Sequence, residues 1–430
     1  MGSGDHDAAW TFPSVGIVSR LMPKQARANR VAVLGAGIMG ASTALFLVRK
    51  GYEVTLVDAA AAPMAGASRW NEGKIHLGYV YAADPTLNTA KRLIPGGLAF
   101  GDLVRELVGS KPAIEVNGAD EIYLIHRRSV VDPRAAGQYL GEVAALARGD
   151  SGAARYLVDV TRATARPIGR AELEAIADTR TIVAGFRVPE RSVRTTSIAD
   201  AFVDVLRAEP RISLMMRTRI TGVRAEGSAW RIEASPGVEG SFDWVVNALW
   251  QGRLAIDLSV GLRPAHAWSS RYRVSMFLET KRPVDFPSVV VSIGPFGDIK
   301  NYNGTNFYVS WYPAGLLAES QEIEPVPPEA LDAGRKARIV EAMRAGLTAL
   351  LPGAEAIFAA AGRVLVEGGW VFAQGQGALD DPAATLHRRD RFGVRRLGTY
   401  LSVDTGKYST APWLAKRLAA EIAGERVSRV

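Results

Sequence analysis

The chain has 430 residues, which is too long for one ordinary compact core, so we expect two or three domains. Hydrophobic residues make up 48% of it and charged residues 22%, which excludes global disorder and a fibrous protein. It contains no cysteine, and this excludes disulfides, thiolate metal sites, a cysteine nucleophile and a cysteinyl link to a cofactor. The net charge is +8, but the basic residues form short pairs such as Arg388-Arg389, so we expect no nucleic-acid partner.

Residues 1–29 are predicted to form a flexible N-terminal extension. They lack the uninterrupted apolar core of a secretory signal, so we expect a cytoplasmic protein. The apolar stretch from Val31 to Val48 is long enough for a crude membrane-helix window. Because glycines interrupt it at a regular spacing, it indicates a strand, a turn and a helix, and we expect no membrane span.

The first predicted elements are a strand at 31–34, a helix at 38–49 and a strand at 53–58, which together make one βαβ unit. A helix expected at 86–108 is interrupted near Pro95. The strands between 271 and 311 predict an antiparallel sheet. The remaining expected elements are helices at 197–207, 331–350 and 412–423 and strands at 121–126, 212–223, 229–235, 244–248 and 397–403.

A glycine motif follows the first strand and opens the first helix. It reads G-A-G-I-M-G and matches the G-x-G-x-x-G fingerprint of dinucleotide-binding units. Its glycines permit a tight turn, close approach of a pyrophosphate and close helix–strand packing, while the helix N-terminus offers free N–H groups. An acid at the end of the second strand is placed to bind a ribose hydroxyl. The expected cofactor contacts of this unit are Gly35, Gly37, Ile38, Met39, Gly40 and Asp58.

The motif alone leaves FAD and NAD open, because G-I-M-G is also similar to the start of NAD-dependent hydroxyacid dehydrogenases of the hydroxyisobutyrate type. The next segment, from Gly66 to Tyr79, reads G-A-S-R-W-N-E-G-K-I-H-L-G-Y. It resembles the flavin-cradling loop of the D-amino acid oxidase (DAO) superfamily, with local resemblance to L-2-hydroxyglutarate oxidases and to flavin-linked glycerol-3-phosphate dehydrogenases. The resemblance implies FAD, with His76 near the reacting ring and cofactor contacts at Ser68, Arg69, Asn71, Gly73 and Lys74.

Three later segments fit the same superfamily. Residues 219–223 resemble the strand that meets the adenine, and residues 244–250 resemble a later strand beside the cofactor. Residues 402–410 resemble the turn of glycerol-3-phosphate dehydrogenases, where N–H groups and a cation stabilise the negative charge of reduced flavin. These likenesses add as expected cofactor contacts Ile220, Asn247, Ala248, Gly406, Lys407, Tyr408 and Ser409.

The resemblance implies an α/β fold with a Rossmann-type FAD-binding domain and an inserted antiparallel-sheet substrate domain. The FAD-binding domain is expected to be discontinuous, over residues 30–115, 188–265 and 360–430. The substrate or cap domain is expected over residues 116–187 and 266–359. Residues 116–187 show little that points to chemistry.

The expected activity is the transfer of hydride from a C–N bond of an amine or amino acid to flavin N5. The alternatives are oxidation of a 2-hydroxy acid or alcohol with FAD, an NAD-dependent dehydrogenase and a non-redox flavoprotein. The expected catalytic residues are His76 as base, Lys407, and Arg273 with Tyr312 for a carboxylate-bearing small-molecule substrate. Oxygen or another acceptor would reoxidise the flavin, and no metal is expected because the histidines show no ligand spacing.

Overall fold

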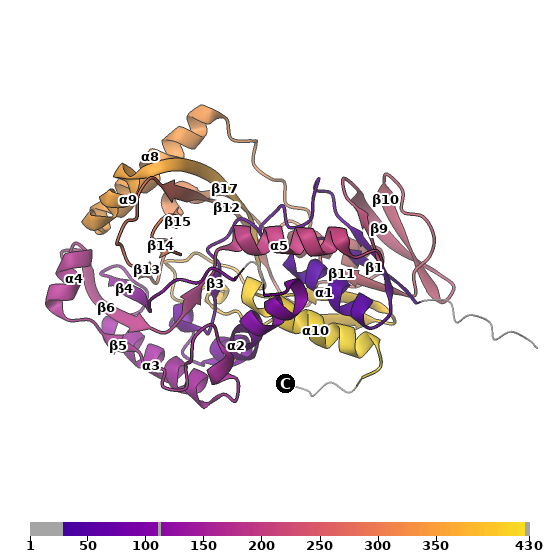
Figure 1. Ribbon diagram of the computed structural model, residues 1–430, viewed down its shortest axis with the longest axis horizontal. Coiled ribbons are helices and arrows are strands. Elements are labelled where there is room, and N and C mark those ends of the chain that lie inside the picture. Colours follow the sequence, from indigo (N-terminus) through magenta and orange to yellow (C-terminus); the bar gives the residue numbers. More distant parts are fainter. Residues whose placement is uncertain (1–28, 111–112, 426–430) are drawn as a thin grey trace, which may run out of the picture.

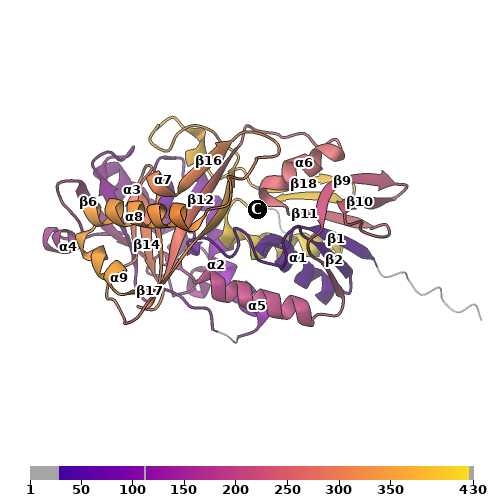
Figure 2. The same ribbon diagram turned by 90° about the horizontal axis from the view of Figure 1, so that it is seen from above.

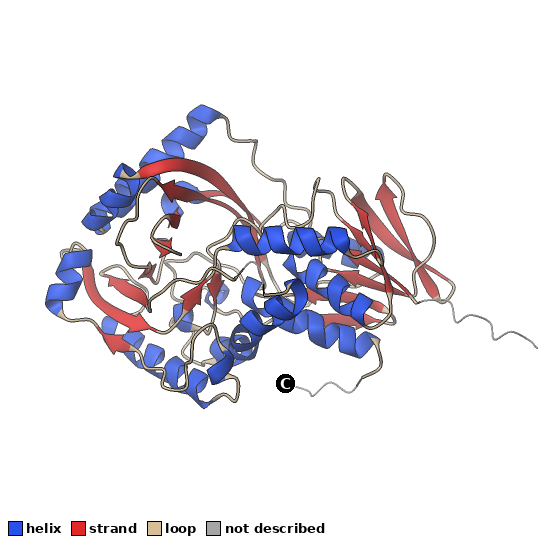
Figure 3. Ribbon diagram, in the orientation of Figure 1, coloured by secondary structure: helices blue, strands red, loops and turns tan. Residues whose placement is uncertain are grey.

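The computed structural model describes residues 29–110 and 113–425, so almost all of the extension expected at 1–29 lies outside the described residues. Figure 1 shows two sheets beside each other, one with helices α1 and α10 and the other with helix α8. The colouring by element in Figure 3 shows helices and strands in both halves, as expected for an α/β fold. Within the described ranges, no helix has both the length and the apolar character needed to cross a bilayer.

The smaller main sheet has six strands and contains the predicted βαβ unit. Its first two strands pair in parallel in register, Val31 with Val54 and Leu34 with Val57, and helix α1 covers Ile38–Arg49. This confirms the predicted unit. In spatial order the strands are β18 (Gly393–Leu397), β19 (Tyr400–Asp404), β11 (Trp244–Asn247), β1 (Arg30–Leu34), β2 (Glu53–Val57) and β8 (Ile212–Met215). Helix α10 (Ala411–Ile422) packs beside α1, and a hairpin of β9 (Arg219–Glu226) and β10 (Ala229–Ser235) extends from the sheet.

The larger sheet has nine strands and is antiparallel except where β13 runs parallel to β4. Strand β12, near one end of this sheet, pairs along one edge with β17 from Ser269–Ala373 to Thr280–Ala361. The expected cofactor segment 360–430 therefore begins with a strand that belongs to the larger sheet. The strands are β16 (Leu316–Ser320), β12 (Ser269–Thr280), β15 (Asn306–Trp311), β14 (Gly297–Asn301), β13 (Val289–Ser292), β4 (Glu121–His126), β6 (Ile182–Val188), β5 (Arg166–Pro167) and β17 (Ala361–Ala373).

Helix α8 (Ala333–Leu350) lies across one face of the larger sheet, as Figure 2 shows. Its buried side chains Met343 and Leu347 share a core with Val274 and Met276 of β12. Two further strands, β3 (Lys74–Ile75) and β7 (Arg191–Ser192), form a small ladder. The other helices are α2 (Asn88–Val108), α3 (Pro133–Gly149), α4 (Arg170–Ile176), α5 (Thr195–Ala208), α6 (Arg253–Ser259), α7 (Tyr312–Gly315) and α9 (Glu355–Ala359).

The interruption expected near Pro95 is wrong, because α2 continues through it as one helix. The two glycines after the proline serve close packing. A Cβ at Gly96 would lie 2.8 Å from Thr410 Cγ2, and a Cβ at Gly97 would lie 2.5 Å from the carbonyl oxygen of His76. Tertiary contacts thus override the local preference to break the helix, and they bring α2 against both loops expected to hold the flavin.

Candidate active site

The glycine motif forms a close-packed turn with an open helix N-terminus. Gly35 has φ +98°, and a Cβ at Gly40 would lie 1.8 Å from the carbonyl oxygen of Gly35. No side chain caps Gly37, and the Ile38 N–H donates to Ser68 Oγ at 2.9 Å. A Cβ at Gly37 would lie 2.9 Å from Ser68 Oγ. The N–H groups at the start of α1, with no side chain between them and Ser68, fit the pyrophosphate of FAD.

Asp58 lies beside this motif at the carboxyl end of β2. Its carboxylate accepts hydrogen bonds from the N–H groups of Ala36 at 2.7 Å and Ala60 at 2.8 Å. Each carboxylate oxygen can accept a further bond, so Asp58 remains able to bind a ribose hydroxyl. These backbone contacts fix the acid at the edge of the sheet where the glycine turn lies.

Substituting Gly40 tests this packing. We expect Gly40→Ala to lower the free energy of unfolding by about 3 kcal/mol, at the upper end for overpacked sites, because backbone rather than a mobile side chain blocks the new Cβ. Urea unfolding and the flavin content of the purified protein measure the effect. Gly141→Ala in α3 is the control, since its Cβ meets nothing within 4 Å and should stabilise the helix by about 0.5–1 kcal/mol. Equal stability of the two variants would contradict the packing role of Gly40.

The loop from Gly66 to Tyr79 is braced by its own side chains. Asn71 donates from Nδ2 to the Ala67 carbonyl and accepts from the Gly73 N–H, each at 2.8 Å. Gly73 has φ +66°, and a Cβ there would lie 1.8 Å from the Val193 carbonyl oxygen. Arg69 forms an ion pair with Asp200 of α5. Arg69, Asn71 and Gly73 therefore hold the loop in place. Direct contact of these three residues with the cofactor stays a prediction.

His76 and Glu72 face each other within this loop, with His76 Nε2 3.7 Å from Glu72 Oε1. Burial, and next the positive charge of Lys407, lower the pKa of His76 to about 3. Burial alone would raise the pKa of Glu72, but His76, Lys407 and Lys74 together hold it well below its usual range. At neutral pH the pair is therefore a neutral imidazole beside a carboxylate, and His76 Nδ1 is buried with no hydrogen-bond partner among the described residues.

Lys74 is buried within a network of charged and aromatic side chains. Its Nζ lies 5.3 Å from the centre of the Tyr123 ring, near Glu121 and Glu190. Glu190 accepts a hydrogen bond from the Leu77 N–H at 2.8 Å and another from the Tyr123 hydroxyl. Burial raises the pKa of Glu190, and the nearby charge of Glu121 raises it further. This network fixes the second half of the loop to strand β4. Residues 116–187 therefore do contribute to the site.

The C-terminal turn predicted to meet the flavin packs against α2 and the same loop. Gly406 has φ +65°, and its N–H donates to Asp404 Oδ1 at 2.9 Å. Tyr408 OH and Ser409 Oγ are buried without partners among the described residues. Burial first, and then the charge of Arg389, lower the pKa of Lys407 to about 7, and its Nζ lies 5.6 Å from the Tyr81 ring centre. Orphaned polar atoms beside a cation fit the polar edge of an isoalloxazine ring.

Three predicted cofactor contacts lie on or directly after strands β9 and β11. Asn247 is fully buried and donates to Asp257 Oδ1 at 3.0 Å and to Tyr400 OH at 2.8 Å. Its amide thus braces β11, while the carbonyl of Ala248 lies 2.6 Å from a Cβ built on Gly35. Ile220, on β9, is partly buried against the core of the six-stranded sheet. All three lie beside the βαβ unit, as the resemblance implies.

Arg273, within β12, contacts Tyr312, which directly follows β15. The guanidinium of Arg273 lies 4.0 Å from the Tyr312 ring centre and donates to Ser310 Oγ at 2.6 Å. Arg271, two residues earlier on the same face of the strand, donates to Tyr312 OH at 2.8 Å. The Nε atoms of both arginines are buried without a partner, so both retain a free donor.

The structure also adds residues that sequence reasoning did not select. Glu72 stands four residues before His76, and only its place inside the flavin loop could have marked it. Arg389 is bound through its Nη1 to the Phe372 carbonyl at 2.9 Å, with Nε unpartnered. Sequence offered no signal for Arg389, because its neighbours Arg271 and Lys407 come from distant segments. Among the described residues, no cluster of His, Asp and Glu could hold a metal ion.

The chain matches the family model for FAD dependent oxidoreductases (DAO) over residues 30–399. Among solved structures, it is similar to glycine oxidase from Geobacillus kaustophilus (TM-score 0.65, 16% identity, covering 93% of this chain and 96% of that one). It is also similar to iminodiacetate oxidase from Chelativorans sp. BNC1 (0.63, 16%, 93% and 97%). A third is L-alpha-glycerophosphate oxidase from Mycoplasma pneumoniae with FAD bound (0.61, 13%, 94% and 96%).

A curated bacterial protein shares a shorter stretch with the chain. The tRNA 5-methylaminomethyl-2-thiouridine biosynthesis bifunctional protein MnmC of Polaromonas naphthalenivorans (strain CJ2) is 40% identical over 65 residues, which are 15% of this chain and 10% of that protein. The family model covers far more of the chain, and it decides for FAD the choice that the glycine motif left open. The chain belongs to the FAD dependent oxidoreductase (DAO) family and is an enzyme that uses FAD.

Proposed function

We propose that this enzyme oxidises a C–N bond of a small, carboxylate-bearing amine or amino acid. The observation that carries the proposal is a group of cations, Arg271, Arg273 and Lys407, of which Lys407 lies near the neutral His76. Arg271 and Arg273 both present unpartnered donors where the sheet covers the loops expected to hold the flavin. A planar guanidinium binds a carboxylate through two parallel hydrogen bonds, which would orient the carbon next to that carboxylate.

Bound FAD would supply the oxidant, taking the substrate hydrogen with its electron pair. The nitrogen lone pair then forms the C=N bond and one N–H proton is lost; water adds to the imine, giving a carbonyl and ammonia. Arg273, stacked on Tyr312, holds the carboxylate. Lys407 accepts the proton that a substrate ammonium must lose, because a group of pKa about 7 is matched to proton transfer near neutral pH.

His76 favours the amine over the alcohol among the two flavin-dependent routes. Oxidising an alcohol requires a base for the hydroxyl proton, and His76, with a pKa of about 3, is a weak proton acceptor. The similar glycine oxidase and iminodiacetate oxidase are named for amine substrates, whereas the similar glycerophosphate oxidase is named for an alcohol. Hydroxy-acid oxidation therefore remains the second candidate.

Anaerobic bleaching of the bound flavin tests the proposal. We expect amino acids or amines to bleach the yellow enzyme with release of ammonia, and 2-hydroxy acids to leave it oxidised. Admitting air and assaying hydrogen peroxide then tests oxygen as the acceptor. Bleaching by hydroxy acids without any bleaching by amines would contradict the proposal.

His76→Ala gives a second test of the same choice. If His76 positions the loop and is not the base, the variant should retain flavin and lose at most about tenfold in the bleaching rate with the amine substrate. Stopped-flow absorbance at the flavin band measures this rate. A variant that keeps its flavin but is no longer reduced by the amine would contradict this positioning role and make His76 the base.

A further inference from the structure

The guanidinium groups of Arg271 and Arg389 form a second cationic cluster beside Arg273. Arg271 is 3% exposed and Arg389 is 8% exposed, and the Nε atoms of both lack hydrogen-bond partners. Arg389 comes from a loop more than 100 residues away, yet its Nη1 is anchored to the Phe372 carbonyl. Phe372 pairs with Ser270 in the β12–β17 ladder, so Arg389 is held one residue along the strand from Arg271.

Among the described residues, no carboxylate forms an ion pair with Arg271 or Arg389. Their guanidinium groups donate hydrogen bonds to uncharged oxygens, the Tyr312 hydroxyl and the Phe372 carbonyl. Glu319 lies opposite Arg271 in the β12–β16 register, but it is exposed and forms no ion pair with Arg271 among the described residues. Burial, together with the like charges of Arg389 and Arg273, lowers the pKa of Arg271, as expected for cations left without an anion.

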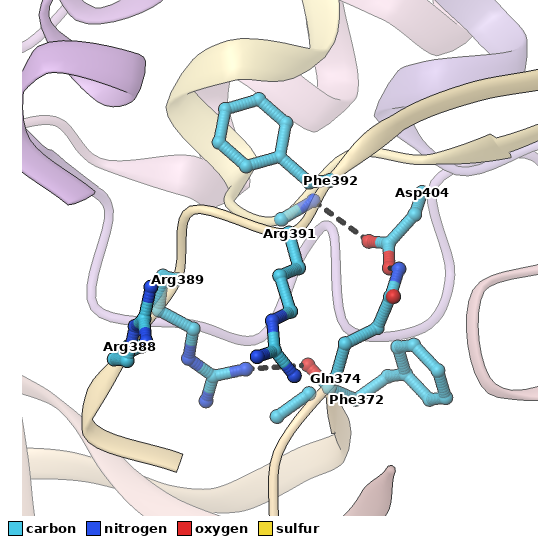
Figure 4. Close-up of a pocket in the computed structure, with 9 residues that line it drawn as sticks. Phe372, Gln374, Arg388, Arg389, Arg391, Phe392 and Asp404 are labelled. Atoms are coloured by element: carbon cyan, nitrogen blue, oxygen red, sulfur yellow. Dashed lines mark hydrogen bonds between the residues drawn. The ribbon is translucent and has the colours of Figure 1, made fainter. Parts of the chain in front are cut away.

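A narrow pocket reaches Arg389. Figure 4 shows the side chains of Arg389 and Arg391 extending toward Phe372 and Gln374 at the end of β17. Gly406, in the turn expected to meet the flavin, is also part of its lining. The one acidic residue of the lining, Asp404, is already bonded to Gln374 at 2.7 Å and to the Gly406 N–H. The pocket therefore brings unpaired cationic donors next to the candidate active site.

We infer that Arg271 and Arg389 form a subsite for a second anionic group of the substrate, in addition to the carboxylate assigned to Arg273. The inference rests on the proposed function for the identity of the oxidised bond. Two guanidinium forks beyond Arg273 exceed what one carboxylate can use, since one carboxylate fills one fork. The preferred substrate is thus an amine with two anionic groups, each a carboxylate or a phospho group.

Ligand binding to the FAD-loaded enzyme tests the subsite without turnover. Non-oxidisable anions are titrated while the visible flavin spectrum is followed: acetate, propionate and butyrate with one carboxylate, and malonate, succinate and glutarate with two. We expect at least one dicarboxylate to bind at least about tenfold more tightly than every monocarboxylate. A parallel titration with 3-phosphonopropionate distinguishes a carboxylate from a phospho group as the preferred second anion. Equal affinities for one and two anionic groups would overturn the inference.

The variant Arg389→Gln separates this subsite from Arg273. The ratio of dicarboxylate to monocarboxylate affinity should fall at least about tenfold, and Arg389→Lys should restore part of it. Arg396→Gln, which removes an exposed arginine from β18, is the matched control and should leave the ratio unchanged. An unchanged ratio in Arg389→Gln, or loss of flavin from both Arg389 variants, would overturn the inference, the latter by assigning Arg389 to the cofactor.

The result of the binding experiment does not depend on whether the enzyme oxidises amines. A flavin that no amine bleaches, in an enzyme that still prefers dicarboxylates and loses this preference in Arg389→Gln, would contradict the proposed function and leave the subsite standing. Bleaching by simple amino acids, together with equal binding of mono- and dicarboxylates, would support the proposed function and contradict the subsite.

Discussion

Replacing Lys300 by methionine is expected to lower the free energy of unfolding by about 3–5 kcal/mol, because it leaves Glu121 as a buried charge without its partner. Lys300 Nζ lies 2.6 Å from Glu121 Oε2, and neither side chain has any exposed surface. Asp298, the next nearest acid, is 3.8 Å from Lys300. Burial alone would raise the pKa of Glu121, and Lys300 is the main group that holds it low.

An exposed pair of the same type is the control for this experiment. Lys336 and Glu367 are 3.2 Å apart and each is more than a third exposed, so Lys336→Met should cost less than about 1 kcal/mol. Urea unfolding of both variants measures the difference. Adding Glu121→Gln to Lys300→Met should recover part of the loss, because the unpaired charge is then removed. A Lys300→Met protein as stable as Lys336→Met would show that water reaches Glu121.

The sequence predicted those parts of the site that depend on local chemistry. The turn at Gly35 and Gly40 requires glycine because backbone atoms occupy the place of a side chain, and such a requirement is visible in a motif. The flavin loop was recognised in the same way, from residues close together in the chain. Arg273 and Tyr312 were selected because they lie on or beside one predicted sheet, and the structure brings them into contact.

The parts that were missed depend on contacts between distant segments. Pro95 indicated a break in α2, but the packing of Gly96 and Gly97 against other loops decides that helix. The pairing of β17 with β12 joins residues about 90 positions apart, and no local pattern specifies that register. Arg389 becomes part of a cationic cluster through this same ladder. The basic pair Arg388-Arg389 gave no indication of which face of the fold its side chains would occupy.

Lys407→Met should have opposite effects on two properties of the protein: it should raise the free energy of unfolding and lower the rate of flavin reduction. In the apoprotein we expect the variant to be more stable than the wild type at neutral pH, since burial of the ammonium beside Arg389 is unfavourable. A pKa lowered from 10.5 to about 7 corresponds to about 5 kcal/mol, and the remaining solvent contact of Lys407 reduces the expected gain to about 2–3 kcal/mol. In the FAD-loaded enzyme, losing this proton acceptor should slow flavin reduction by about 100-fold.

The dependence on pH identifies the lysine as the cause. The unfolded chain binds this proton more strongly than the folded one, so wild-type stability should rise as the pH increases from about 7 to 10.5, and the variant should lack this rise. Lys416→Met, which removes an exposed lysine of α10 paired with Glu106, is the control and should keep the wild-type pH dependence. Urea unfolding of the apoprotein at several pH values and stopped-flow flavin reduction measure the two effects. A destabilised Lys407→Met apoprotein would mean that the ammonium is neutralised within the protein, and the role of Lys407 as proton acceptor would then fail.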